Sequence, residues 1–146
     1  PSYYTPQNEE SLLESSKERI RGKHILLAED NELNAEIAMT ILEDMGLTVE
    51  RVEDGIKCVD KIEQTPAGHF DLILMDIQMP NMDGYKATQA IRRLPDPRKA
   101  HIPIIAMTAN AFEEDKKMAI AKGMNGHIVK PISVEKIESV MLSILK

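Results

Sequence analysis

Polar side chains that could do chemistry come directly after four short apolar runs of the sequence. Of these five side chains, three carry a carboxylate, one carries a hydroxyl group and one carries an ammonium group. In chain order they are Glu29 and Asp30 after residues 25–28, Asp76 after 72–75, Thr108 after 104–107, and Lys130 after 128–129. If these runs are parallel strands of one sheet, all five side chains lie at the same edge of that sheet.

This combination of groups is suited to magnesium-dependent phosphoryl transfer. Clustered carboxylates repel one another, and each charge raises the pKa of the others. A divalent cation relieves that repulsion, and Mg²⁺ prefers one or two carboxylates together with water and phosphate oxygens. A carboxylate can attack phosphorus and hold it as an aspartyl phosphate, while Thr108 and Lys130 contact the phosphoryl oxygens. Asp76, at the end of a central strand, is the best-placed nucleophile.

The elements that would position these residues are apolar runs alternating with segments of helical period. The runs that we interpret as strands are residues 25–28, 47–52, 72–75, 104–107 and 128–129. Apolar spacing of three and four predicts helices over 33–45, 56–62, 87–94 and 134–145, and a less clearly patterned one over 112–122. Gly46 and Gly123 stand where helix C-termini favour a left-handed residue. The alternation predicts an α/β fold, with a parallel sheet covered on both faces.

The first predicted helix has the apolar face that we expect to pack on the sheet. Its members are Leu33, Ile37, Ala38, Ile41, Leu42 and Met45.

The composition of the runs also indicates the order of the strands. Strands buried on both faces are continuously apolar, but residues 47–52 include Glu50 and Arg51, and the last run is short and preceded by His127. These two strands therefore belong at the edges, and right-handed crossovers favour the order 2-1-3-4-5. In that order the chain reverses direction beside the first strand, where open α/β sheets bind ligands.

Each site residue also has a purely structural interpretation. The acidic pair and Asn31 could cap the following helix, and Asp76 could be an ordinary loop acid. Thr108 could be another cap, and Lys130 could be a solvated surface cation. Four unrelated features have little reason to meet at one edge with complementary chemistry, so we favour the phosphoryl-transfer interpretation.

The composition excludes several other classes of protein. A chain of 146 residues, with 42% hydrophobic and 29% charged residues, is typical of one globular domain. Its net charge of −6 and its lack of Trp argue against nucleic-acid binding by bulk charge or base stacking. The single Cys58 rules out an internal disulfide and a cysteine-based zinc site. No apolar run reaches the roughly 18 residues that span a bilayer, and residues 1–6 have neither the basic nor the apolar region of a signal peptide. We therefore expect a cytoplasmic location for this domain, with any membrane anchor of the parent protein elsewhere.

Residues 1–22 differ from the remainder of the chain. They are polar with few apolar side chains, which indicates a linker or N-terminal extension before a domain over residues 23–146. The alternative is a short helix that packs on a partner. Because the chain has no initiator Met, we expect a fragment of a longer protein.

Residues 24–146 resemble the receiver domains of the two-component response-regulator family. The resemblance rests on motifs in matching order: Glu29-Asp30-Asn31 with Asn34, Asp76 followed by Met79-Pro80 and Asp83-Gly84, Thr108-Ala109, and Lys130-Pro131. It implies a flavodoxin-like, doubly wound, five-stranded parallel sheet in the order 2-1-3-4-5, with helices on both faces.

The resemblance also implies a role for each site residue. Asp76 is similar to the phosphoacceptor, Thr108 to the hydroxyl that moves toward the phosphoryl group, and Lys130 to the salt-bridging lysine. The expected Mg²⁺ ligands are Asp30, Asp76, Glu29 through a bound water, and the backbone carbonyl of Gln78. The Lys130-Pro131 peptide bond is expected to be cis.

Two positions depart from the commonest pattern of the family. Glu29 stands where an aspartate is more usual, a replacement that is frequent in receivers attached to sensor kinases and should preserve metal binding. His127 stands where an aromatic side chain usually reports the switch. Its ring either faces solvent at the sheet edge or moves inward when Asp76 is phosphorylated. With Asn110 and Gln78, it is a candidate for tuning the switch or the phosphoryl lifetime.

Residues 29–34 further resemble receivers at the C-terminus of hybrid sensor histidine kinases. That resemblance implies two partners, the phosphohistidine domain of a sensor kinase and a downstream histidine phosphotransfer domain, with no DNA-binding output domain after the last helix. A stand-alone regulator is the alternative architecture. A metal-dependent phosphatase would need a second aspartate where Gln78 stands. A receiver-like module that is never phosphorylated would usually lose an acid or Lys130.

Overall fold

Five parallel strands form one sheet in the order β2-β1-β3-β4-β5, as predicted. The structure, a computed structural model, describes residues 20–109 and 112–144. The strands are β1 (His24–Ala28), β2 (Thr48–Val52), β3 (Leu72–Asp76), β4 (Ile104–Thr108) and β5 (Gly126–Val129). Every residue of β3 and β4 is buried, whereas β2 is only partly covered, because it lies at an edge of the sheet.

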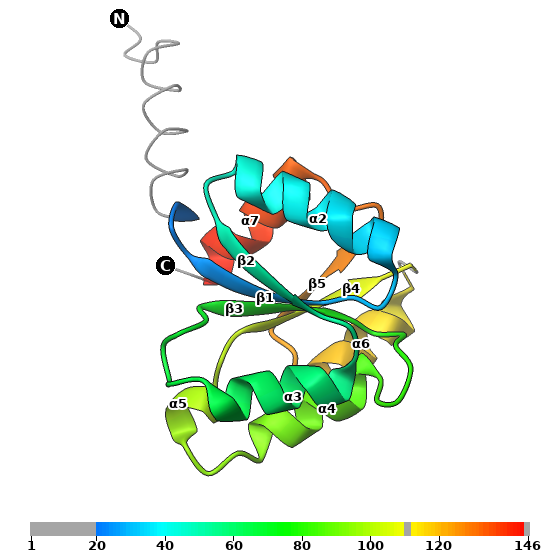
Figure 1. Ribbon diagram of the computed structural model, residues 1–146. Coiled ribbons are helices and arrows are strands. Elements are labelled where there is room, and N and C mark those ends of the chain that lie inside the picture. Colours follow the sequence, from blue (N-terminus) through cyan, green and yellow to red (C-terminus); the bar gives the residue numbers. More distant parts are fainter. Residues whose placement is uncertain (1–19, 110–111, 145–146) are drawn as a thin grey trace, which may run out of the picture.

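Helices cover both faces of the sheet, which gives the doubly wound, flavodoxin-like architecture that was predicted (Figure 1). The helices are α2 (Glu32–Asp44), α3 (Gly55–Gln64), α4 (Gly84–Arg92), α5 (Pro97–Ala100), α6 (Glu113–Ala121) and α7 (Val134–Ile144). Helices α2 and α7 bury apolar side chains against one face, and α3, α4 and α6 do so against the other. The two resulting cores meet at the sheet, which holds the strand ends in fixed positions.

Local sequence signals account for where the helices start and stop. Asn31 caps α2 by accepting a hydrogen bond from the Asn34 amide at 2.9 Å. Asp83 caps α4 in the same way, through the Lys86 amide at 2.8 Å. Gly46 and Gly123 have φ values of 88° and 103°, as the predicted left-handed positions require.

The predicted apolar face of the first helix is only partly buried. Ala38 and Leu42 pack in the core, together with Ala35, but Leu33 is 65% exposed and Ile37 is 49% exposed. Apolar spacing alone groups these residues on one stripe, yet the helix turns the first part of that stripe away from the sheet. The exposed side chains lie beside the candidate site described below.

The short α5 was not predicted. Its four residues are too few for a helical period to be visible, although Asp96 at the N-cap and Pro97 in the first turn are typical helix-start signals.

The first described residues, from Ile20 to Gly22, contact the rest of the domain. Ile20 is only 1% exposed and packs with α2 and α7, and the Gly22 amide donates to the Gly46 carbonyl at 2.8 Å. The predicted boundary at residue 22 remains a prediction, because residues 1–19 lie outside the described part. Among the described residues, no helix is both long enough and apolar enough to cross a membrane.

Cys58 on α3 provides a test of the core. The side chain is fully buried, and burial raises the pKa of its thiol to about 12. The thiolate is the reactive form, so at pH 8 only about one molecule in 10,000 is reactive. We expect no labelling of the native protein by a thiol-specific reagent, and one label per chain after unfolding in guanidinium. The variant Ser139→Cys, with an exposed thiol on α7, should label at once; equally fast labelling of native Cys58 would contradict the described packing.

Candidate functional site

Three carboxylates meet at the carboxyl ends of β1 and β3, as predicted. One oxygen from each of Glu29, Asp30 and Asp76 lies within 4.8 Å of the others. Glu29 is 2% exposed and Asp76 is 6% exposed, whereas Asp30 faces solvent. Two buried carboxylates and one exposed carboxylate therefore border an opening through which a small ion or phosphoryl donor can enter.

Lys130 forms ion pairs with two of the three carboxylates in this acidic cluster. Its Nζ lies 3.0 Å from Glu29 Oε1 and 3.1 Å from Asp76 Oδ2. The residue follows β5, where its amide donates to the Thr108 carbonyl at 2.7 Å. The Lys130-Pro131 peptide bond is cis, as expected. The ammonium group therefore bridges the ends of two strands that are far apart in the sequence.

Burial and neighbouring charges change the proton affinities of the cluster. Burial raises the pKa of Glu29, and the adjacent Asp76 carboxylate raises it further, while the hydrogen bond from Lys130 acts in the opposite direction. Burial disfavours the charged form of Lys130, but its hydrogen bonds and ion pairs with Glu29 and Asp76 outweigh this effect and raise its pKa. Lys130 is therefore held as a cation, and it neutralises only part of the negative charge.

Backbone amides fix the second oxygen of each buried carboxylate. The Gln78 amide donates to Asp76 Oδ1 at 3.2 Å, and the Asn31 amide donates to Glu29 Oε2 at 3.2 Å. Both carboxylates are thus held by an amide on one oxygen and by Lys130 on the other. This arrangement orients the cluster before any ligand arrives.

A cleft of about 420 Å³ connects the cluster with the end of β4. Thr108, 8% exposed, and Gln78 line this cleft together with the three acids and Lys130. His127 is half-buried on β5 and lines a separate groove beside α7. Asn110 lies outside the described residues.

Two residues that shape the site, Arg51 and Gly84, were not predicted from the sequence. Arg51 on β2 donates through Nε and Nη2 to the Glu29 carbonyl at 3.0 and 2.9 Å, and through Nη2 to the Asp30 carbonyl at 3.2 Å. A Cβ at Gly84 would overlap the backbone carbonyl oxygen of Asp76. In the sequence, Arg51 indicates only that its strand lies at an edge of the sheet. The Asp83-Gly84 motif does not reveal that position 84 must lack a Cβ.

The chain matches known receiver sequences over most of its length. The family described as response regulator receiver domain matches residues 25–141. The sensor protein GacS of Pseudomonas syringae pv. syringae is 41% identical over 123 residues, which cover 84% of this chain. Histidine kinase 1 of Arabidopsis thaliana is 36% identical over an alignment that is 161 positions long with its gaps and that covers 90% of this chain. This chain spans only 13% of the length of each of these two proteins.

A solved structure is similar in both sequence and fold. It is the receiver domain of the sensor histidine kinase PA1611 from Pseudomonas aeruginosa, which has a magnesium ion coordinated in its active-site cleft. Its sequence is 36% identical and its TM-score is 0.75, with 85% of this chain and 98% of that chain covered. The present chain therefore belongs to the response regulator receiver domain family, and it is a receiver domain of a two-component phosphorelay.

Proposed function

We propose that Asp76 accepts a phosphoryl group from a phosphohistidine in a magnesium-dependent reaction. The observation that carries the proposal is the position of Asp76 at the end of the central strand, within one small cluster with Glu29 and Asp30 and 3.1 Å from Lys130. A carboxylate oxygen of Asp76 forms a bond to phosphorus as the bond from phosphorus to the imidazole nitrogen breaks. The imidazole leaves with the electron pair of that bond and takes up a proton.

The donor set fits a hard divalent cation. All three acids offer oxygen atoms, Asp30 is exposed to solvent, and Gln78 lines the same cleft. We propose Asp30, Asp76 and the Gln78 carbonyl as direct ligands of Mg²⁺, with Glu29 acting through a bound water. When bound, the ion supplies positive charge to the phosphoryl oxygens.

Lys130 and Thr108 complete the proposed machinery. Lys130 already contacts Asp76, so its ammonium group is placed to neutralise a phosphoryl oxygen on that residue. The hydroxyl of Thr108, in the same cleft, would donate to another phosphoryl oxygen. His127, Asn110 and Gln78 are proposed to tune the switch or the phosphoryl lifetime.

Removal of the metal tests this function. We expect intact-mass spectrometry to show one added phosphoryl group after incubation with acetyl phosphate and Mg²⁺, and almost none when EDTA is present. The reason is that the partly neutralised carboxylates repel an incoming phosphate unless a divalent cation is bound. Adding Mg²⁺ in excess over EDTA should restore labelling. Equal labelling with and without metal would contradict the proposal.

The relatives suggest the setting in which the site works. GacS is described as a sensor protein and the Arabidopsis relative as a histidine kinase. We propose that this receiver is part of a hybrid sensor histidine kinase. It would take the phosphoryl group from the phosphohistidine of that kinase and pass it to a histidine phosphotransfer domain.

An exposed apolar surface beside the cleft would receive the partner. Leu33 and Ile37 of α2 are exposed, and a groove of about 400 Å³ runs from Ile37 to Lys130 and Ile132. An apolar patch next to a reactive carboxylate is suited to docking a helical protein that carries the phosphohistidine.

The variant Ile37→Glu separates docking from chemistry. We expect phosphotransfer from a phosphohistidine domain to slow by about tenfold, equivalent to about 1.4 kcal/mol, because a buried charge is introduced at the interface. Labelling by acetyl phosphate, which needs no docking surface, should be unchanged. Ile56→Glu on α3, also at an exposed isoleucine, should leave both reactions unchanged. Equal slowing with both donors would show that Ile37 serves the site and not a partner.

A further inference from the structure

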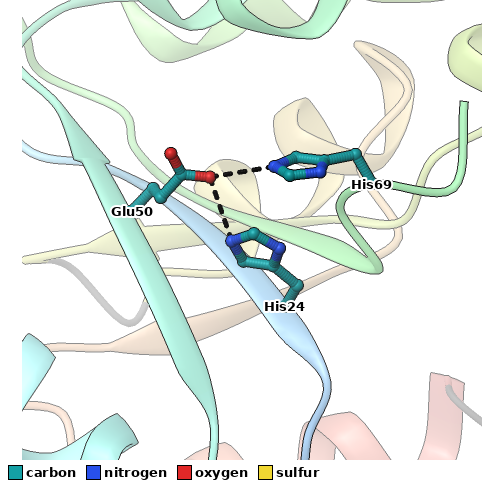
Figure 2. Close-up of side chains that lie close together, drawn as sticks. All are labelled: His24, Glu50 and His69. Atoms are coloured by element: carbon teal, nitrogen blue, oxygen red, sulfur yellow. Dashed lines mark hydrogen bonds and ion pairs between the residues drawn. The ribbon is translucent and has the colours of Figure 1, made fainter. Parts of the chain in front are cut away.

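A second cluster of metal-ligating side chains lies at the other end of the sheet (Figure 2). It consists of His24 at the start of β1, Glu50 in β2, and His69 in the loop between α3 and β3. One ligand atom from each residue lies within 4.8 Å of the others. His24 is separated from Glu29 by the length of β1, about 16 Å for five extended residues. The cluster is therefore distinct from the site around Asp76.

Both imidazoles face one carboxylate oxygen. Nε2 of His24 lies 3.0 Å from Glu50 Oε2, and Nε2 of His69 lies 3.1 Å from the same oxygen. In a tetrahedral zinc site with metal–ligand distances of 2.0–2.1 Å, neighbouring ligand atoms are about 3.3 Å apart. The two nitrogen–oxygen separations are thus already close to those of a ligand set.

The contact with His24 is not a satisfied hydrogen bond. Within the described residues, His24 Nε2 is buried and has no partner in hydrogen-bond geometry, although Glu50 Oε2 is 3.0 Å away. A buried ring nitrogen without an aligned partner is costly. A cation bound to both atoms, off the line that joins them, would satisfy the nitrogen and the carboxylate together.

The surroundings hold the two rings in place. The His24 and His69 centroids are 4.5 Å apart, and each ring packs on Phe70, at 4.7 and 4.6 Å. The side chains of Glu50 and His69 remain 37% and 38% exposed, so an ion can reach them from solvent. The cluster is therefore ordered on its inner side and open on its outer side.

We propose that His24, Glu50 and His69 bind a borderline-soft divalent metal ion, with Zn²⁺ as the ion that best fits two imidazoles and one carboxylate. Such a set leaves one tetrahedral position for water. Magnesium is disfavoured here, because it prefers oxygen ligands in octahedral geometry. The bound ion would link β1, β2 and the loop before β3.

Lys61 is a cation that already pairs with Glu50 and could replace a metal ion as its partner. Its Nζ lies 3.4 Å from Glu50 Oε1, the carboxylate oxygen that does not contact the histidines. Lys61 leaves Oε2 available, and together with His69 it keeps the carboxyl group ionised, since their hydrogen bonds lower the pKa of Glu50 despite partial burial. In the alternative outcome, the cluster is an ion-pair network that binds no metal.

The test is zinc titration of the whole chain in a large excess of Mg²⁺, which keeps the acidic cluster occupied. Competition with a chromophoric chelator should reveal one zinc ion per chain. Ring-nitrogen NMR should show large shifts of Nε2 in His24 and His69 only. His69→Asn and Glu50→Gln should each weaken zinc binding by at least about tenfold. The matched control His101→Asn, at an exposed histidine beside α5, should not.

The variant Asp76→Asn distinguishes this proposal from the proposed function. It should lose phosphorylation and keep zinc binding, whereas His69→Asn should do the reverse. The proposal is overturned if the parent chain binds no zinc in the presence of Mg²⁺. It is also overturned if zinc affinity is unchanged in His69→Asn and Glu50→Gln, or if it falls only in Asp76→Asn.

Discussion

Replacing Asp76 with asparagine is expected to lower phosphoryl uptake by at least about a thousandfold, because the change removes the carboxylate that we propose as the nucleophile. A neutral amide cannot attack phosphorus to form the acyl phosphate that is proposed for the carboxylate. The two side chains have the same shape, and Lys130 keeps its 3.0 Å contact with Glu29, so the fold should persist. Labelling by acetyl phosphate with Mg²⁺, followed by intact-mass spectrometry, measures the effect.

Asp60→Asn is the matched control for this experiment. Asp60 is an exposed aspartate on α3, outside the acidic cleft. Its replacement removes one carboxylate without touching the site, so labelling should equal that of the parent chain. If Asp76→Asn were labelled as fast as Asp60→Asn, the phosphoacceptor would have to be another residue.

Magnesium is expected to stabilise the folded chain, because it relieves repulsion among three carboxylates whose charge Lys130 neutralises in part. A ligand at 100 times its dissociation constant adds about 2.7 kcal/mol to the free energy of unfolding. For a domain of this size, that corresponds to a rise in melting temperature of roughly 8 °C. Because the pKa of Glu29 is raised, protons compete with the metal, and the rise should shrink as the pH falls.

Asp30, an exposed residue that we propose as a direct ligand, provides the variant for this second test. Asp30→Asn removes a proposed direct ligand without disturbing a buried group, so the melting temperature should respond to Mg²⁺ less than half as much. Glu32→Gln, an exposed acid two residues further along, should respond like the parent chain. If the melting temperature of the parent chain did not change on addition of Mg²⁺, a metal site at this cluster would be contradicted.

The sequence predicted the strand order and the acidic cluster because both follow from short-range patterns. Continuous apolar runs identify β1, β3 and β4 as central strands, and the parallel arrangement then brings the residues after them to one edge. The cluster of Glu29, Asp30 and Asp76 needs no knowledge of side-chain conformation. It requires only that the carboxyl ends of parallel strands lie together.

The features that were missed depend on tertiary contacts that no local pattern encodes. The exposure of Leu33 and Ile37 depends on how α2 is rotated about its own axis when it packs on the sheet. The spacing of apolar residues in the sequence is the same for any such rotation. Arg51 reaches the Glu29 carbonyl only because β2 pairs with β1 in one particular register.

The cluster of His24, Glu50 and His69 was missed for the same reason. Its members are separated by 26 and 19 positions in the sequence, far outside the spacing of a short metal-binding motif. They meet because β1 and β2 are neighbours and because the loop before β3 folds back over the same end of the sheet.

Direct localisation of the phosphoryl group is the sharpest test of the central claim. Borohydride reduces an aspartyl phosphate to homoserine, which survives proteolysis and can be located by tandem mass spectrometry. After labelling with acetyl phosphate and Mg²⁺, we expect homoserine at position 76 and at no other aspartate. Homoserine at Asp30 or any other position, or none at all in a chain that carries the label, would contradict the assignment of Asp76 as the phosphoacceptor.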